Sequence, residues 1–348
     1  MSRCKLEEFI SYEQPTKYIV DSDQYDDSYE IPVLTAGKSF ILGYTDEKNN
    51  IFDDLPVIIF DDFTTSVQFV DFPFKVKSSA MKLLKNTEQA DVKYCYYLLK
   101  FLQHTPENHK RQWLSATSQN TVELPTIEEQ KNIVKKLDKI LEVIDNQNKQ
   151  LELLDEAIKA RFVEMFGFPV SNTKGWKTEQ MGEVAPAVNY KGKFDDKIWL
   201  LNLDMVEAQT GRVLDYLFVS EEEVGNSTCT FDTSNVLYSK LRPYLNKVVI
   251  PDRCGYATSE LVPLKPVSTK INREYLAFML RSDEFVNMIN EKVAGAKMPR
   301  VSMGDFRKFD VPVPPIELQN QFADFVKQVD KSKFFSNHSL FLLKSITF

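Results

Sequence analysis

Three stretches of this sequence combine basic, aromatic, hydroxyl and amide side chains, the residue types with which proteins contact nucleic acid. YSKLRPYLNK spans residues 238–247, AGAKMPRVSMGDFRK spans 294–308, and HKRQWLSATSQN spans 109–120. Basic groups position a protein on phosphates, whereas Arg, Asn, Gln and Ser side chains read base edges. The same pattern also fits solvated turns with buried aromatic rings, so both interpretations stay open at this point.

Two other residue patterns could indicate a nucleotide-binding or metal-binding site, but their residues do not have the spacing that such a site requires. The tripeptide that begins at Gly37 reads Gly-Lys-Ser, but a phosphate-binding loop needs a further glycine five residues earlier, where this chain has Pro32. The histidines at 104, 109 and 338 have no spacing that would bring them together around a metal ion. We therefore predict no catalytic residue and no metal site.

Acidic pairs and cysteines give no stronger signal. We interpret the pairs at 53–54, 61–62 and 195–196 as exposed turn carboxylates rather than cation ligands. The four cysteines lie far apart without metal-ligand spacing. Free thiols in a reducing compartment are the simplest interpretation.

The totals describe a soluble protein of two or three domains, with 348 residues, 43% hydrophobic and 27% charged. The net charge of −7 does not exclude nucleic acid, because phosphate contacts depend on local patches. No apolar run approaches the roughly 20 residues that cross a bilayer, and the first residues, MSRCKLEEFI, lack the apolar core of a secretion signal. We expect a cytoplasmic protein without a membrane partner.

The chain contains one short motif twice, LPTIEEQ at 124–130 and VPPIELQ at 313–319. The copies are 189 residues apart (Pro125 to Pro314; 314 − 125 = 189). After each copy, apolar residues recur at steps of three and four, which predicts a long helix with a heptad seam. In the first helix, expected over 128–166 and roughly 60 Å long, the apolar seam consists of Ile133, Leu137, Ile140, Ile144, Leu151, Leu154 and Ile158.

Each predicted helix follows a block of mixed strands and helices. In the first block we expect a strand over 56–63, a strand pair over 66–77 and a helix over 91–103. In the second block we expect a strand, turn and strand over 235–251 and one or two helices over 271–290. The fold class is therefore α+β, with two globular blocks that are each followed by a long helix, and the second helix is the candidate partner for the apolar stripe of the first. The expected boundaries are 1–124, 125–166, 167–313 and 314–348.

These motifs resemble the specificity subunit of type I restriction-modification systems over nearly the whole chain. LPTIEEQKNIVKKLDKILEVID and VPVPPIELQNQFADFVKQVD resemble the two spacer helices of that family. NVLYSKLRPYLNKVV, ATSELVPLKP and GAKMPRVSMGDFRKFDVPVPP resemble its target-recognition domains, and YEIPVLTAGKSFILGYT, IIFDDFTTSVQFVDFPFKVKSSAMKLL and HKRQWLS resemble a different subtype of that domain.

The resemblance implies that each domain reads one half of a bipartite double-stranded DNA target, which is asymmetric because the two blocks differ. It implies that the two long helices form an antiparallel coiled coil in a pseudo-twofold repeat that separates the two globular domains. It also implies that these helices dock two methyltransferase subunits, and the seven apolar seam residues from Ile133 to Ile158 are the predicted docking residues. Adenine methylation with S-adenosylmethionine, and ATP- and Mg-dependent cleavage by a restriction/translocase subunit, would then belong to the partners, with no cofactor in this chain. The last helix is expected to be shorter than the first.

We predict DNA contacts from both domains, those at 38–39 and 64–65 chiefly from the resemblance. The residues are Lys38, Ser39, Thr64, Thr65, Lys110 and Arg111 in the first, and Lys240, Arg242, Tyr244, Lys247, Lys297, Arg300 and Ser302 in the second. Two alternatives remain: a nuclease or methyltransferase with an unfamiliar active site, and a coiled-coil structural adaptor without its own DNA readout.

Overall fold

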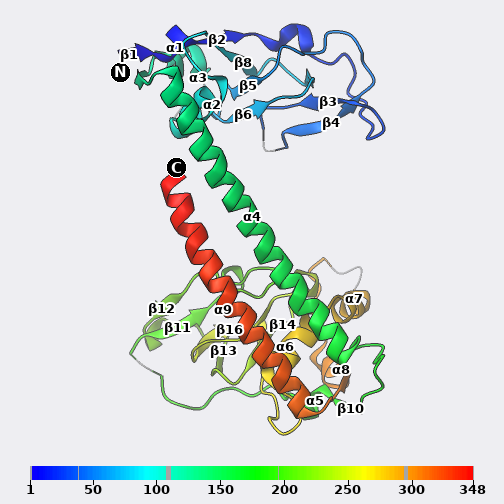
Figure 1. Cartoon of the computed structure of the whole chain (residues 1–348). Helices are drawn as coiled ribbons and strands as arrows, with labels where there is room; N and C mark the ends of the chain where they lie inside the picture. The colour runs from blue at the N-terminus through cyan, green and yellow to red at the C-terminus, as the bar shows by residue number, and fades with distance from the viewer. Residues whose placement is uncertain (1, 38, 107–110, 195, 294–296, 348) are drawn as a thin grey trace. The chain divides into compact units, whose positions relative to one another are not determined.

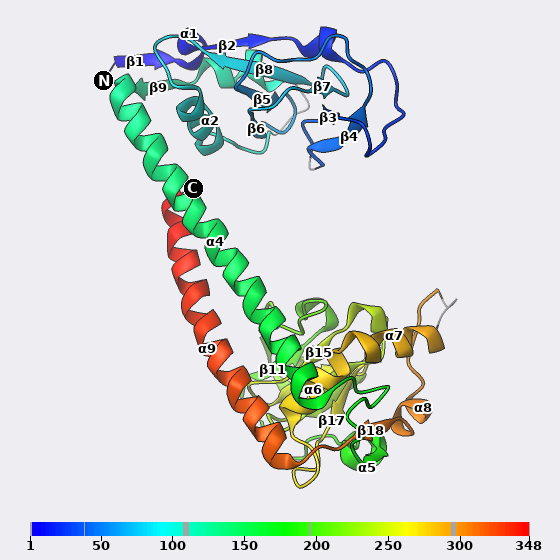
Figure 2. The same ribbon diagram turned by 45° about the vertical axis from the view of Figure 1, so that its right-hand side comes forward.

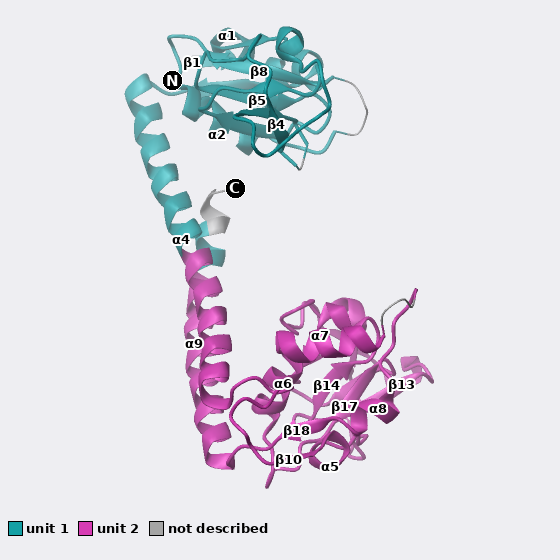
Figure 3. Cartoon of the chain, turned by 90° about the vertical axis from the view of Figure 1, so that its right-hand side faces the viewer, with its two compact units in different colours: residues 1–146, 340–348 teal, residues 147–339 magenta. Residues whose placement is uncertain are grey.

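A computed structural model describes residues 2–37, 39–106, 111–194, 196–293 and 297–347 of the chain. These residues form two compact units, shown in different colours in Figure 3. Unit 1 comprises residues 1–146 and 340–348, and unit 2 comprises residues 147–339. The boundary between the units therefore divides both long helices, after residue 146 in the first and after residue 339 in the second.

Unit 1 is built on two small sheets and a two-stranded ribbon (Figure 1). The larger sheet is antiparallel, in the order β2 (Ile10–Glu13), β8 (Met81–Asn86), β5 (Val57–Asp61) and β6 (Val67–Val70). The smaller sheet has the order β4 (Ile41–Thr45), β3 (Ile31–Leu34) and β7 (Lys75–Val76). The ribbon pairs β1 (Ser2–Lys5) with β9 (Thr121–Leu124). All five side chains of β5 are buried, as its apolar sequence predicts.

Short helices complete unit 1, the longest being α2 (Val92–Phe101), which begins at the cap residue Asp91. The Asp91 carboxylate accepts hydrogen bonds from the backbone N–H groups of Lys93 and Tyr94, satisfying two free donors of the first turn. The remaining helices are α1 (Leu6–Phe9), η1 (Pro15–Tyr18), α3 (Gln112–Ser115) and η2 (Thr117–Gln119).

Unit 2 repeats this design with different strands. One sheet has the order β12 (Leu217–Val219), β11 (Ile198–Leu201), β16 (Gly255–Thr258), β13 (Thr228–Phe231), and the other has β15 (Val248–Val249), β14 (Val236–Ser239), β17 (Leu261–Leu264). A ribbon again pairs β10 (Thr178–Gln180) with β18 (Asp310–Pro312). The helices are α5 (Met181–Val184), η3 (Leu203–Met205), η4 (Glu221–Glu223), η5 (Pro243–Leu245), α6 (Arg273–Arg281), α7 (Asp283–Lys292) and α8 (Met303–Arg307).

The long helix α4 (Ile127–Phe166) begins where Thr126 and Glu129 bond each other's backbone N–H groups through their side chains. It ends at Gly167, whose φ of 75° suits glycine. Within unit 2 it runs antiparallel to α9 (Ile316–Thr347), as Figure 2 shows. The register is defined by a Gln147–Ser339 hydrogen bond (3.1 Å), the Asp155–Lys333 ion pair and rings of Phe162 and Phe322 5.4 Å apart.

The sequence-based secondary structure is confirmed in most places. The two predicted long helices, the strands at 56–63 and 66–77, the helix at 91–103 and the two helices at 271–290 all exist. Near the end of α4 the buried positions continue with Phe162 and Phe166, which lie beyond the predicted apolar seam. Ile144 and Ile158 of the predicted seam are buried, whereas Ile133 is exposed.

Candidate nucleic-acid interface

In unit 1, the glutamine of the first repeated motif joins the long helix to the globular block. Gln130 is fully buried. Its side-chain oxygen accepts a hydrogen bond from the backbone N–H of Asp91 (2.8 Å), and its Nε2 donates to the carbonyl oxygens of Gln89 (3.2 Å) and Pro125 (2.8 Å). Because Asp91 is the cap of α2, this one side chain fixes the start of α4 to the start of α2.

In unit 2, the glutamine of the second motif makes the same joint. Gln319 is fully buried, and its oxygen accepts from the backbone N–H of Asn272 (2.8 Å), the cap residue of α6. Its Nε2 donates to the carbonyl oxygens of Lys270 (2.9 Å) and Pro314 (2.8 Å). The repeated motif therefore encodes a repeated connection between a long helix and a domain.

The predicted contact residues of unit 2 come together on a short ribbon of two segments, 240–242 and 299–301, which we call the basic ribbon. The backbone N–H of Val301 donates to the Lys240 carbonyl oxygen (2.8 Å), and that of Arg242 donates to the Pro299 carbonyl oxygen (2.8 Å). Leu241 and Arg300 form a β-bridge between the two segments. Two stretches that lie about 60 residues apart in sequence thus place their basic residues on one ribbon.

Exposed side chains project from the basic ribbon and the turn that follows it. Arg242 and Asn246 flank the turn η5, and both have left-handed backbone conformations, with φ of 49° and 48°. Tyr244 at the tip is 47% exposed. Arg300 is exposed but pairs with Glu260 at 3.0 Å. A ligand with phosphates would have to compete with that carboxylate for the guanidinium.

The remaining predicted residues of unit 2 differ in their availability. Lys297 is exposed next to the ribbon, and Ser302 is exposed while its hydroxyl oxygen caps α8. Lys247 is partly buried, and its Nζ donates to the Leu203 carbonyl oxygen (2.6 Å). Burial also lowers the pKa of Lys247. Lys247 therefore anchors the turn from beneath in this structure.

The sequence did not point to Gln209, which supports the same turn. Its backbone N–H donates to the Leu245 carbonyl oxygen (2.9 Å), and its side-chain nitrogen donates to the Tyr244 carbonyl oxygen (2.9 Å). Gln209 is exposed and precedes Gly211, which has a φ of 69°. Near Gln209, only Gly211 signals a tight turn in the sequence. No residue around Gln209 indicates that it contacts the turn at 242–246.

In unit 1, two predicted stretches meet at the end of β5. The Asp62 carbonyl oxygen accepts from the Gln112 N–H (2.8 Å), and its carboxylate accepts from the Trp113 N–H (3.0 Å). This places exposed Arg111 beside the turn that carries exposed Thr64. The exposed Phe63 of that turn was not predicted.

Asp61 and Asp62 are buried, so the interpretation of this pair as exposed carboxylates is wrong. The Asp61 carboxylate accepts from the backbone N–H groups of Phe63 and Thr64, which closes the turn. Asp62 forms an ion pair with Lys82, with Nζ and Oδ2 2.9 Å apart, although the two groups are not aligned as a hydrogen bond. Both side chains are fully excluded from solvent, which is rare for charges unless they are paired.

The other predicted residues of unit 1 are less favourably placed. Thr65 is 2% exposed, and its hydroxyl donates to the His104 carbonyl oxygen (2.6 Å), so that hydroxyl is already used. Ser39 is exposed in the turn between β3 and β4, which belong to the other sheet. Lys38 and Lys110 lie outside the described residues.

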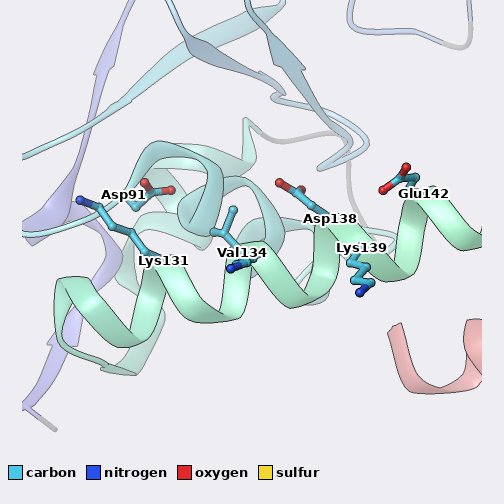
Figure 4. A pocket seen from close by; sticks show the side chains of 7 residues that line it. Asp91, Lys131, Val134, Asp138, Lys139 and Glu142 are labelled. Carbon is cyan, nitrogen blue, oxygen red and sulfur yellow. The ribbon is translucent and has the colours of Figure 1, made fainter.

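Beside the unit 1 joint, α4 lines a shallow groove of about 410 Å³ (Figure 4). Its lining mixes charges, and Asp138 in it bonds Lys93 (2.8 Å) and the Tyr97 hydroxyl of α2. The groove thus belongs to the contact that holds α4 against α2. The full lining is Asp91, Lys131, Val134, Lys135, Asp138, Lys139 and Glu142.

The described part of the chain contains no cluster of metal ligands, no membrane-spanning helix and no disulfide. No group of three or more His, Cys, Asp or Glu side chains within it is arranged to hold a metal ion. Among the described helices, none combines the length and the apolar character needed to cross a bilayer. All four cysteines, which lie within this part, are free.

The sequence of this chain is similar to those of several known proteins. Residues 173–339 match the family model described as the type I restriction modification DNA specificity domain. A type I restriction enzyme specificity subunit from Escherichia coli is 31% identical over 93% of this chain and 85% of its own length. The MjaVIII specificity subunit of Methanocaldococcus jannaschii is 22% identical over 73% of this chain and 67% of its own.

Solved structures support the fold. The type I restriction-modification S subunit from M. genitalium superposes with a TM-score of 0.61 at 15% identity, covering 99% of this chain and 93% of that one. A chain from a study of complex assembly and conformational transition of the type I system gives 0.58 at 13% identity, covering 99% and 95%. With the 31% identical relative, these matches show that the chain belongs to the family of type I restriction enzyme specificity subunits, the non-catalytic DNA-recognition components of these systems.

Proposed function

We propose that the two units each read one half of a bipartite, asymmetric double-stranded DNA target. The observation that carries this proposal is the repeated glutamine joint, which attaches two domains of unlike sequence to equivalent points of two long helices. Two copies of one attachment with different domains suit two different half-sites. In unit 2 the basic ribbon and Tyr244 form the contact surface, and in unit 1 the turn at 61–66 with Arg111 does so.

The long helices would dock the partners, two methyltransferase subunits and a restriction/translocase subunit. Several large apolar side chains support this role because they are exposed on α4 and α9: within unit 2, Leu153 is 61% exposed and Phe334 69%. Of the seven predicted docking residues, Ile144 and Ile158 are buried within the chain, so they would support the helices rather than meet a partner.

S-adenosylmethionine, ATP and Mg would be bound by those partners in the cytoplasm, and this chain would direct adenine methylation or cleavage. The test is a genome-wide map of methyladenine in cells with the gene present and deleted, the methyltransferase gene being left intact. A split, asymmetric motif that loses its methylation on deletion is the expected result. Methylation that is unchanged by deletion would contradict the proposal.

If the map does not change, a structural adaptor is the competing function. Co-purification with the methyltransferase, followed by DNA titration at several salt concentrations, separates the two. A DNA-reading complex should lose affinity steeply as salt rises, because phosphate contacts release counterions. An adaptor without DNA readout should add nothing to the binding of the partner alone.

A further inference from the structure

Helix α6 connects the glutamine joint of unit 2 to the turn that presents Tyr244. At its first turn, the cap residue Asn272 donates its backbone N–H to Gln319 and accepts from the Tyr275 N–H (2.8 Å) through its side chain. At its other end lies Arg281. The helix is nine residues long, about 13 Å, and most of its side chains are deeply buried, so it can act as a rigid element.

Arg281 bonds both the end of the turn and the strand that follows it, β15. Its guanidinium donates two hydrogen bonds to the Val248 carbonyl oxygen, from Nε (3.1 Å) and from a terminal nitrogen (2.5 Å). Its own carbonyl oxygen accepts from the Asn246 side-chain nitrogen (2.9 Å). Asn246 ends the turn in a left-handed conformation and is 6% exposed, so its bond to Arg281 holds the C-terminal end of the turn.

The same arginine is electrostatically coupled to both long helices. Burial lowers the pKa of Arg281 to about 10, while Asp330 of α9 and Asp155 of α4 act in the opposite direction. Asp155 also pairs with Lys333 across the two helices. At neutral pH the guanidinium remains charged. Helix α6 also begins at the Gln319 joint with α9, so a shift of α9 would move the residue at the other end of α6, Arg281.

We propose that Arg281 is a positioning residue for DNA reading, through which α6 transmits the placement of the long helices to the turn at 242–246. This inference rests on the proposed function of that turn. It adds that the reading surface of unit 2 is positioned by an arginine that does not itself touch DNA and whose guanidinium donates both of its hydrogen bonds to one carbonyl oxygen.

The test uses the complete system in cells, with the methyladenine map as the measurement. The test variants are Arg281→Gln and Arg281→Lys. The matched control is Arg273→Gln, because Arg273 is the arginine at the opposite end of α6. For Arg281→Gln we expect sequence selectivity to fall at least about fivefold at the bases of one half-site only, because only unit 2 contains this turn. Arg281→Lys should give an intermediate loss, since a lysine keeps the charge but not the paired donors. Arg273→Gln should keep both half-sites.

A general loss of folding would look different, because it lowers methylation at every target while leaving both half-sites equally strict. That result with Arg281→Lys, or unchanged selectivity with both variants, would overturn the positioning role. The wild-type map distinguishes failure of the positioning role from failure of the proposed function. If wild-type cells show no split motif that depends on the gene, the proposed function itself is wrong.

Discussion

Gln130 and Gln319 make the same three hydrogen bonds in two different domains. Each accepts from the cap residue of a helix, Asp91 or Asn272, and each donates to a carbonyl two residues before that cap and to the proline five residues before itself. A second pair of bonds follows the same scheme, from Leu6 to Asn120 (3.1 Å) and from Met181 to Phe309 (2.8 Å). The motif that recurs after 189 residues is therefore repeated in its hydrogen bonds as well as in its sequence.

Replacing Gln319 with leucine should lower the free energy of unfolding by about 2–4 kcal/mol, because several buried backbone groups lose their partner. Gln321→Leu, two residues further along α9 at an exposed position, is the control and should change little. Urea denaturation of both variants measures the difference. Equal midpoints for the two variants would show that the joint contributes no stability.

The Lys82–Asp62 pair should behave as a buried ion pair. Lys82→Met leaves the Asp62 carboxylate buried without its cation, which should lower the free energy of unfolding by about 3–5 kcal/mol. The double variant Lys82→Met/Asp62→Asn should recover much of this loss, because an amide can still accept from Trp113 without a charge. A double-mutant cycle measures the coupling, and simple additivity of the two single changes would contradict it.

This pair also shows where sequence reasoning ends. The heptad steps and cap residues of α4 are local, so its extent was predictable from the sequence. Asp62 follows a strand and looks like a turn residue, and its partner Lys82 lies on a neighbouring strand, so no local pattern reveals the contact. Gln209 and Glu260 were missed for the same reason, since each meets its partner only through the tertiary fold.

Arg300→Ala should weaken binding of the methyltransferase complex to its target about tenfold or more if Arg300 reads a base. The loss would then depend on one base pair of the half-site. If Arg300 contacts phosphate, binding to all sequences should weaken and the salt dependence should become shallower. Titration of target and scrambled duplexes at several salt concentrations distinguishes the two roles, and unchanged binding to both would remove Arg300 from the site.

Gly211→Ala should disturb the backbone at Val248, next to the turn at 242–246. Gly211 has a φ of 69°, and an added Cβ would overlap the Val248 carbonyl oxygen, the group that Arg281 holds. We expect the free energy of unfolding to fall by more than about 1 kcal/mol, since a positive φ and a steric overlap add together. Gly225→Ala is the control, because a Cβ there meets nothing within 4 Å. Thermal denaturation of the pair tests this; matching stabilities would contradict the close approach.

Two thiols should resist alkylation in the folded protein. Burial raises the pKa of Cys95 to about 12 and that of Cys229 to about 11. At pH 8, below both values, only about one part in ten thousand of Cys95 and one in a thousand of Cys229 would be the reactive thiolate. Iodoacetamide followed by peptide mass analysis should modify both only after urea is added. Rapid native modification of Cys95 would contradict its burial.

The glutamine joint has a consequence for how such chains diverge. All six atoms that bond the two glutamine side chains are main-chain atoms, which belong to the cap residues, to the carbonyls two residues before them and to the prolines of the motif. Every residue has a backbone carbonyl group, and every residue except proline has a backbone N–H group. The glutamine joint therefore places little restriction on the side chains around it. Mutation can rewrite a reading surface while its attachment survives, which fits a fold that persists at 15% identity.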